Sequence, residues 1–169
     1  QHNPHHLYDV LTHTAVVVKN VPPLPHLRLA ALLHDIGKPQ TYSQDQNGIG
    51  HFYGHSQVSA TMAQAILTRL KYDKQTIARV CTLIKYHDTE LEPQKNIIKK
   101  WLRQLPPAVF NELIILKQAD DLAHNPAYTE RKQTLAEVIE LTQEILTEPA
   151  CLSLKDLKID GNDLIALGY

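Results

Sequence analysis

The chain has 169 residues, enough for one domain with a hydrophobic core, and its net charge of −1 excludes a general electrostatic affinity for nucleic acid. No apolar run is long enough for a membrane span, and two cysteines cannot form a disulfide framework. These features favour a cytoplasmic protein that associates with neither membranes nor DNA.

The N-terminal part of the chain shows helical periodicity that gives way to an irregular segment. An apolar stripe over 7–18 predicts an amphipathic helix. A second, almost wholly apolar helix is expected from about residue 26 to 36, where Gly37 and Pro39 end it. The turn residues within 39–53 predict an irregular loop, with a short hairpin as the alternative.

Helical periodicity continues to the C-terminus, with no convincing series of strands. Five further helices are expected over 55–70, 77–87, 93–102, 109–120 and 129–147. Asp160 is a plausible cap for one short helix in the tail, 151–169. The sequence thus predicts an all-α domain of about seven helices over 1–150. The tail is expected to begin a following region of a longer protein.

A histidine and an aspartate stand side by side at the end of the most apolar helix. His34 and Asp35 close the stretch LRLAALLHD. A helix that is apolar on every face is buried, and a carboxylate there is costly unless it is paired or binds a metal. An ordinary helix C-terminus, where a histidine is favourable against the helix dipole, is the alternative.

Four other residues are candidates to join this pair at the centre of the bundle. His55, His87 and Asp120 lie in phase with apolar stripes, and His13 lies at the flank of one. Each alone has a simpler explanation, because a core-facing histidine is more often hydrogen-bonded packing than a ligand, and Asp120 could cap a neighbouring helix. Together with His34 and Asp35 they predict a binuclear metal site, in which Asp35 bridges the ions.

The donor set restricts the metal and its chemistry. Imidazoles and carboxylates without a thiolate suit one or two ions of iron, manganese, nickel, cobalt or zinc, with magnesium as a further candidate. Water shared by two such ions becomes a nucleophile near neutral pH, and phosphoryl oxygens can coordinate the same ions. Lys38, one turn after Asp35, is placed to neutralise charge on a phosphoryl group, with a solvated surface lysine as the alternative.

A basic stripe is a candidate for contact with RNA. It consists of four side chains at helical spacing on one side of Trp101, namely Lys95, Lys99, Lys100 and Arg103. Such a stripe could contact a phosphate backbone. A basic helix face is, however, more often simply solvated.

The order His13, His34-Asp35, His55, His87, Asp120 resembles the HD-domain superfamily of metal-dependent phosphohydrolases. The phrases HHLYDVLTHT, HFYGHSQVSATMAQAILTRLK and LIKYHD resemble the HD domain of bacterial CCA-adding enzymes, the tRNA nucleotidyltransferases. The closing KIDGNDLIALG resembles the segment after that domain. The resemblance implies hydrolysis of phosphomonoesters and 2′,3′-cyclic phosphodiesters. His51, one helical turn before His55, and Asp88 are candidates for supporting the metal ligands, and His6, one heptad before His13, is a candidate for a supporting residue or a ligand.

One departure limits what the resemblance implies. The nucleotidyl-transfer domain of that family uses a Gly-Ser turn and an Asp-x-Asp pair, and this sequence contains neither. The chain alone is therefore not expected to add CCA to tRNA. Three readings stay open: a hydrolase of nucleotide or RNA-terminal phosphates, a non-catalytic tRNA-binding or structural module, and a cyclic- or signalling-nucleotide phosphodiesterase.

Overall fold

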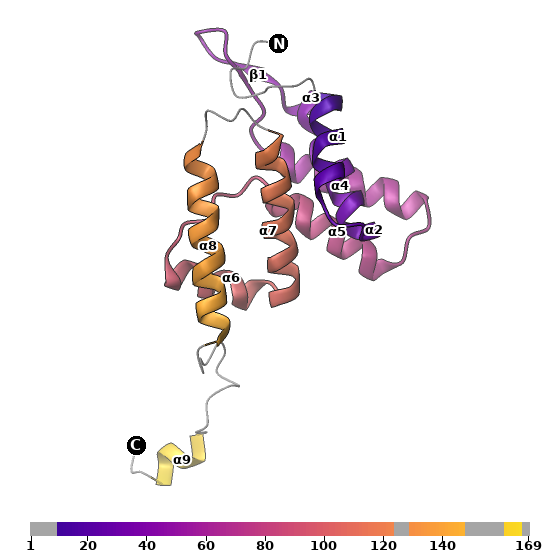
Figure 1. The fold of residues 1–169 in the computed structure, drawn as a ribbon. Coiled ribbons are helices and arrows are strands. Elements are labelled where there is room, and N and C mark those ends of the chain that lie inside the picture. The colour runs from indigo at the N-terminus through magenta and orange to yellow at the C-terminus, as the bar shows by residue number, and fades with distance from the viewer. Residues whose placement is uncertain (1–9, 124–128, 148–160, 167–169) are drawn as a thin grey trace.

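The computed structural model describes residues 10–123, 129–147 and 161–166, and within them the fold is almost entirely helical (Figure 1). The first elements are α1 (Val10–Asn20), α2 (Pro25–Leu33), α3 (Lys38–Thr41), β1 (Ser43–Gln44) and β2 (Gly50–His51). They are followed by α4 (His55–Arg69), α5 (Lys74–Tyr86), α6 (Lys95–Gln104), α7 (Pro107–Leu122), α8 (Thr129–Thr147) and α9 (Gly161–Ala166). No helix among these residues combines the length and the apolar character that a membrane span requires.

The all-α prediction is confirmed; other helix ends differ from the expected ones by a few residues, and the larger differences lie in 34–53. The second helix ends at Leu33 rather than near residue 36, and a single further helical turn, α3, begins at Lys38. Pro39 occupies the first turn of α3, where a missing N–H costs nothing, so it starts a helix here instead of preventing one. The loop closes as the short hairpin, with Ser43 paired to His51 and Gln44 to Gly50.

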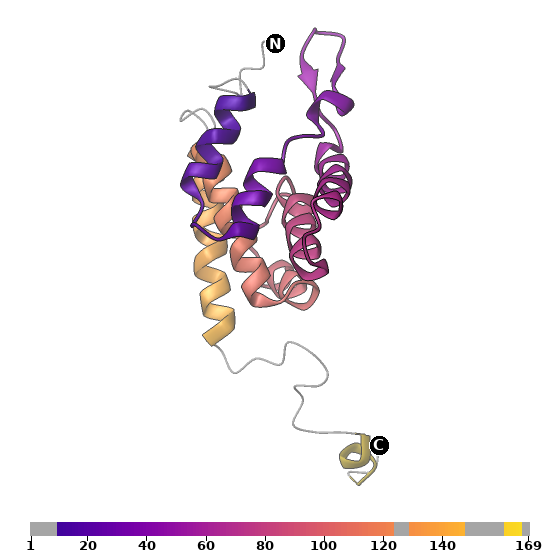
Figure 2. The ribbon, with the colours of Figure 1, turned by 90° about the vertical axis from the view of Figure 1, so that its right-hand side faces the viewer.

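Helices α1, α2 and α4 to α8 share one hydrophobic core, and two views show how they enclose it (Figures 1 and 2). The α4–α5 pair lies against α2, while α7 contacts α1, α2 and α5 and is covered by α8. Fully buried side chains such as Leu27, Leu83 and Phe110 come from α2, α5 and α7. Helices that are distant in sequence therefore meet around α2, the helix that leads to His34 and Asp35.

A charged clamp holds three of these helices together. Glu112 of α7 accepts two hydrogen bonds of 2.7 Å from Arg79 of α5, and its Oε1 lies 2.9 Å from Nε2 of His26 on α2. Burial alone would raise the pKa of the Glu112 carboxyl, but the contacts with Arg79 and His26 lower it. The paired carboxylate thereby fixes α2, α5 and α7 relative to one another.

Gly37 lies where the chain after α2 crosses α4 at very short range. Its N–H donates to Oγ of Ser59 at 2.9 Å. A Cβ on Gly37 would lie 2.7 Å from the backbone nitrogen of Ser59 and 2.8 Å from the carbonyl oxygen of His55. Because backbone atoms of a packed helix cannot move aside cheaply, only glycine fits at this crossing.

Gly37→Ala should therefore destabilise the fold by about 1–3 kcal/mol, lowering the melting temperature by roughly 3–10 °C in a thermal denaturation followed by circular dichroism. Gly54→Ala is the matched control, because nothing lies within 4 Å of a Cβ there. Its cost comes only from the positive φ of 75° and should be about 1 kcal/mol. Equal melting temperatures for Gly37→Ala and the wild type would contradict the close crossing.

Candidate metal centre

Five segments of the fold deliver the six candidate ligands to one place. His13 comes from α1, His34 and Asp35 follow directly after α2, and Asp120 lies in the last turn of α7. His55 is the first residue of α4, and His87 is the residue that caps the C-terminus of α5. Every one of the six is at most 7% exposed. The inward direction expected from helix phase for His55, His87 and Asp120 is therefore what the structure shows.

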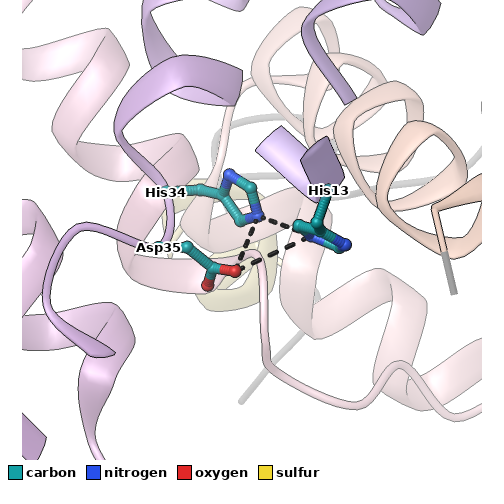
Figure 3. Close-up of side chains that lie close together, drawn as sticks. All are labelled: His13, His34 and Asp35. Carbon is teal, nitrogen blue, oxygen red and sulfur yellow. Dashed lines mark hydrogen bonds and ion pairs between the residues drawn. The ribbon is translucent and has the colours of Figure 1, made fainter. Parts of the chain in front are cut away.

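The first group of side chains surrounds one oxygen of Asp35 (Figure 3). Oδ2 of Asp35 lies 3.3 Å from Nε2 of His34 and 3.7 Å from Nε2 of His13. The same Nε2 of His13 lies 2.9 Å from Oδ1 of Asp120. Donor atoms that bind one ion at about 2 Å lie at distances from one another similar to those measured here. His13, His34 and Asp35 can therefore share an ion, and Asp120 lies beside both of these histidines.

The second group surrounds the other oxygen of the same carboxylate. Oδ1 of Asp35 lies 3.3 Å from Nε2 of His55 and 3.7 Å from Nε2 of His87. The two imidazole nitrogens lie 3.2 Å apart. Asp35 thus presents one oxygen to each group, the arrangement that a carboxylate bridging two ions requires.

Backbone carbonyls fix the orientation of three of the four imidazoles. Nδ1 lies 2.7 Å from the Ala31 oxygen in His34, 2.9 Å from the Phe52 oxygen in His55 and 2.7 Å from the Ile84 oxygen in His87. A carbonyl oxygen only accepts, so each Nδ1 carries the proton and donates. In the neutral ring, Nε2 is then left with a lone pair directed into the centre, as in histidines that bind metals.

In each group, two histidine Nε2 atoms face each other at a distance that favours a cation between them. Nε2 of His13 and Nε2 of His34 lie 3.3 Å apart, much as the second pair does. Two lone pairs at that distance repel unless a proton or a metal ion lies between them. Since each pair also faces a carboxylate oxygen, the donor set fits two divalent ions, one for each group.

Ionisation equilibria show the same preference for positive charge. Burial disfavours the imidazolium of His34, but the Asp120 and Asp35 carboxylates outweigh it and raise the pKa of His34 to about 10. Burial likewise opposes the charged form of Asp35, and the contacts with His34, His55 and His87 hold its pKa well below the ordinary value. In the second pair, burial lowers the pKa of His87, while the Asp35 contacts raise that of His55 against the effect of burial. A cation is thus stabilised in each group.

Lys38 is buried against the metal centre. Its Nζ donates to Oδ2 of Asp35 at 2.6 Å, and its side chain is only 10% exposed, which excludes the alternative of a solvated surface lysine. The ammonium also lies 5.7 Å from the centroid of the Phe52 ring. Lys38 is therefore placed beside the carboxylate that both groups share.

The candidate supporting residues lie at different distances from this centre. Oδ2 of Asp88, whose side chain is 54% exposed, is 3.8 Å from Nδ1 of His55. His51 lies on β2, where its Nε2 is 3.2 Å from Oδ2 of Asp45, a partner within the hairpin. His6 falls outside the residues that the structure describes. Asp88 thus lies beside a candidate metal ligand, whereas the contact of His51 lies within the hairpin.

The basic stripe lies on α6, away from the six ligands. Lys95 donates to Oε1 of Glu144 on α8 at 2.6 Å, so part of its charge is balanced within the domain. Lys100 and Arg103 are exposed, and Lys99 is partly buried. Trp101, beside the stripe, packs against the ring of Tyr86.

Lys117 is a buried cation that the sequence reasoning missed. From α7, its Nζ donates to the carbonyl oxygens of His87 at 2.5 Å and Thr89 at 2.7 Å. Burial lowers the pKa of Lys117 to about 8. The signal was available, because Lys117 shares the apolar stripe of Leu113 and Asp120. It binds a carbonyl that the C-terminus of α5 leaves without a helical partner.

Lys117→Met should lower the melting temperature and weaken metal binding by the second group about 10- to 100-fold, because His87 loses the contact that fixes its backbone. Thermal denaturation and calorimetric titration with Mn²⁺ measure both effects. Lys132→Met, at an exposed position of α8, is the control. Unchanged stability and metal affinity in Lys117→Met would show that the contact positions nothing.

Comparison with known proteins gives a consistent family of relatives. The chain is 31% identical to the CC-adding tRNA nucleotidyltransferase of Thermus thermophilus over 83% of its own length and 31% of that protein. It is 36% identical to the A-adding tRNA nucleotidyltransferase of Deinococcus radiodurans over 62% of the chain and 24% of that protein. With the multifunctional CCA protein of Legionella pneumophila it shares 28% identity, over 99% of the chain and 40% of that protein.

The chain thus spans less than half the length of each of these curated relatives. No solved structure gives a significant match. The family model of the HD domain matches residues 5–125, a range that contains all six candidate ligands. The similarity to an HD region of tRNA nucleotidyltransferase-like proteins, expected from the sequence phrases, is confirmed. By this match, the chain belongs to the HD domain family.

Proposed function

We propose that this chain is a metal-dependent phosphohydrolase domain that acts on nucleotide or RNA-terminal phosphates, either monoesters or 2′,3′-cyclic diesters. The observation that carries the proposal is the Asp35 carboxylate with one oxygen toward each of two histidine groups. Two ions held this way are typical of enzymes that hydrolyse phosphoesters. Similarity to tRNA nucleotidyltransferases supports a role in tRNA processing.

The six candidate ligands would form two binding sites for divalent ions. His13, His34, Asp35 and Asp120 would hold one divalent ion, and Asp35, His55 and His87 a second. Bound ions would supply Lewis-acid activation of the phosphoryl group and of a water molecule. Fixed Nδ1 contacts to backbone carbonyls keep the imidazoles in position before substrate arrives.

Lys38 would add a positive charge on the substrate side of Asp35. In the structure its ammonium donates to Oδ2 of Asp35. That oxygen would bind an ion in the loaded protein, so the ammonium could turn to a phosphoryl oxygen, where it would stabilise developing negative charge. This role needs only a change of partner at the tip of a flexible side chain.

A second function is a tRNA-contacting module within a longer protein. The exposed Lys100 and Arg103 on α6 favour it, because they lie on a helix separate from the metal ligands and could meet a phosphate backbone. In that case the metal groups would serve the fold. The two functions are compatible in one domain, and measurements of activity and of RNA binding distinguish them.

The test is a panel of phosphoesters offered to protein loaded in turn with Mn²⁺, Ni²⁺, Co²⁺, Fe²⁺, Zn²⁺ and Mg²⁺. We expect release of phosphate from a nucleoside 2′- or 3′-monophosphate, or opening of a 2′,3′-cyclic phosphate, and no addition of CCA with ATP and CTP. Protein treated with a chelator is the control. Failure to hydrolyse any substrate with any metal, together with tight salt-dependent tRNA binding, would overturn the proposal and favour the module.

A further inference from the structure

The β1–β2 hairpin carries two pairs of aromatic rings. Tyr42 and Phe52 lie with their centroids 5.6 Å apart, and His51 and Tyr53 are stacked at 5.0 Å with an angle of 9° between their planes. The Tyr53 side chain is 76% exposed, which is unusual for a ring of this size. An exposed ring with one face already stacked has its other face available to a ligand.

The orientation of these rings is fixed by polar and close contacts within the hairpin. Nε2 of His51 lies 3.2 Å from Oδ2 of Asp45, whose other oxygen accepts from the backbone of Asn47 and Ile49. Gly50 leaves room for the Tyr42 ring, because a Cβ there would lie 2.7 Å from Cε2 of that ring. These contacts hold the His51 and Tyr42 rings in place, and Tyr53 stacks on His51.

The same segment leads directly into the metal centre. The carbonyl oxygen of Phe52 accepts a hydrogen bond from Nδ1 of His55, and the Lys38 ammonium lies over the Phe52 ring. The chain enters α4 at His55, two residues after Tyr53. The hairpin projects from the end of the domain at which α1, the helix of His13, also begins (Figure 2). Phe52 thus contacts both His55 and Lys38, and Tyr53 is the next residue along the chain.

We propose that Tyr53, stacked on His51, is a nucleobase subsite that receives the base of the nucleotide whose phosphate is hydrolysed. A nucleotide carries its base one sugar away from its phosphate, and single-stranded nucleic acids are held by stacking of bases on aromatic side chains. The inference rests on the proposed function, because it assigns the substrate class of that site. It selects nucleotides over phosphoesters without a base.

Steady-state kinetics of Tyr53→Ala test the subsite. We expect KM for a nucleoside 2′,3′-cyclic phosphate or a 3′-nucleotide to rise about tenfold, with kcat nearly unchanged. Hydrolysis of glycerol 2-phosphate, which has no base, should stay the same, and Tyr53→Phe should restore KM because it keeps the ring. Tyr72→Ala, an equally large change at an exposed site between α4 and α5, is the control.

A binding measurement separates this inference from the proposed function. Affinity of chelator-treated protein for a short single-stranded RNA, followed by fluorescence anisotropy, should fall severalfold in Tyr53→Ala and not in Tyr72→Ala. If the wild type hydrolyses nothing, the proposed function fails while this measurement still decides the subsite. Equal RNA affinity in the wild type and Tyr53→Ala, or an equal rise of KM for glycerol 2-phosphate, would overturn the nucleobase subsite.

Discussion

Added Mn²⁺ or Ni²⁺ should raise the melting temperature of the protein by about 5–10 °C, and Asp35→Ala should abolish this rise. An ion that binds only the folded state at a hundred times its dissociation constant stabilises it by about 2.7 kcal/mol. For a chain of this length each kcal/mol shifts the transition by roughly 2–4 °C. Asp35 offers an oxygen to both ligand groups, so its loss weakens both at once.

The measurement is thermal denaturation with and without metal, compared within each variant so that any intrinsic change in stability cancels. Asp35→Asn is the matched control for side-chain volume, since an amide keeps the shape but loses the negative charge that binds a divalent cation. Asp88→Ala, which removes an exposed carboxylate near His55, should keep most of the rise. An identical metal-dependent shift in wild type and Asp35→Ala would mean that the ions bind elsewhere.

Phosphoester hydrolysis should fall by at least about a thousandfold in Asp35→Ala and by less, about a hundredfold, in Lys38→Ala. The aspartate is needed to hold both ions, whereas the lysine supplies a single charge-stabilising contact. Initial rates with a 3′-nucleotide, measured at saturating metal, give both ratios. Lys74→Ala, at an exposed position on α5, should leave the rate unchanged.

The arrangement of the ligand groups requires a larger loss of activity in Asp35→Ala than in Lys38→Ala. Equal losses in Asp35→Ala and Lys38→Ala would mean that Lys38 acts on Asp35 itself rather than on substrate, since their side chains are in contact in the structure. Full activity in Asp35→Ala would place the chemistry outside the two ligand groups. A metal-dependent rise in melting temperature without any hydrolysis would identify the ions as structural.

The apolar periodicity of the sequence determines much of this fold. A helix that packs on a core must bury one face, so apolar spacing revealed the helices and the inward direction of His55, His87 and Asp120. The motif phrases revealed the family for the same kind of reason, since the residues that hold a metal allow few replacements in type or order. Helix ends near 34–53 were less predictable, because Pro39 can either end a helix or begin one.

Contacts between distant segments were decided only by the tertiary structure. The sequence suggested that Asp35 bridges two ions, but the distances from its two oxygens to His34 and to His55 depend on how α2 packs against α4 and α5. The two carbonyls bound by Lys117 of α7 likewise lie just after the end of another helix, α5. Local periodicity determines which face of a helix is buried, but only packing determines what each buried atom meets.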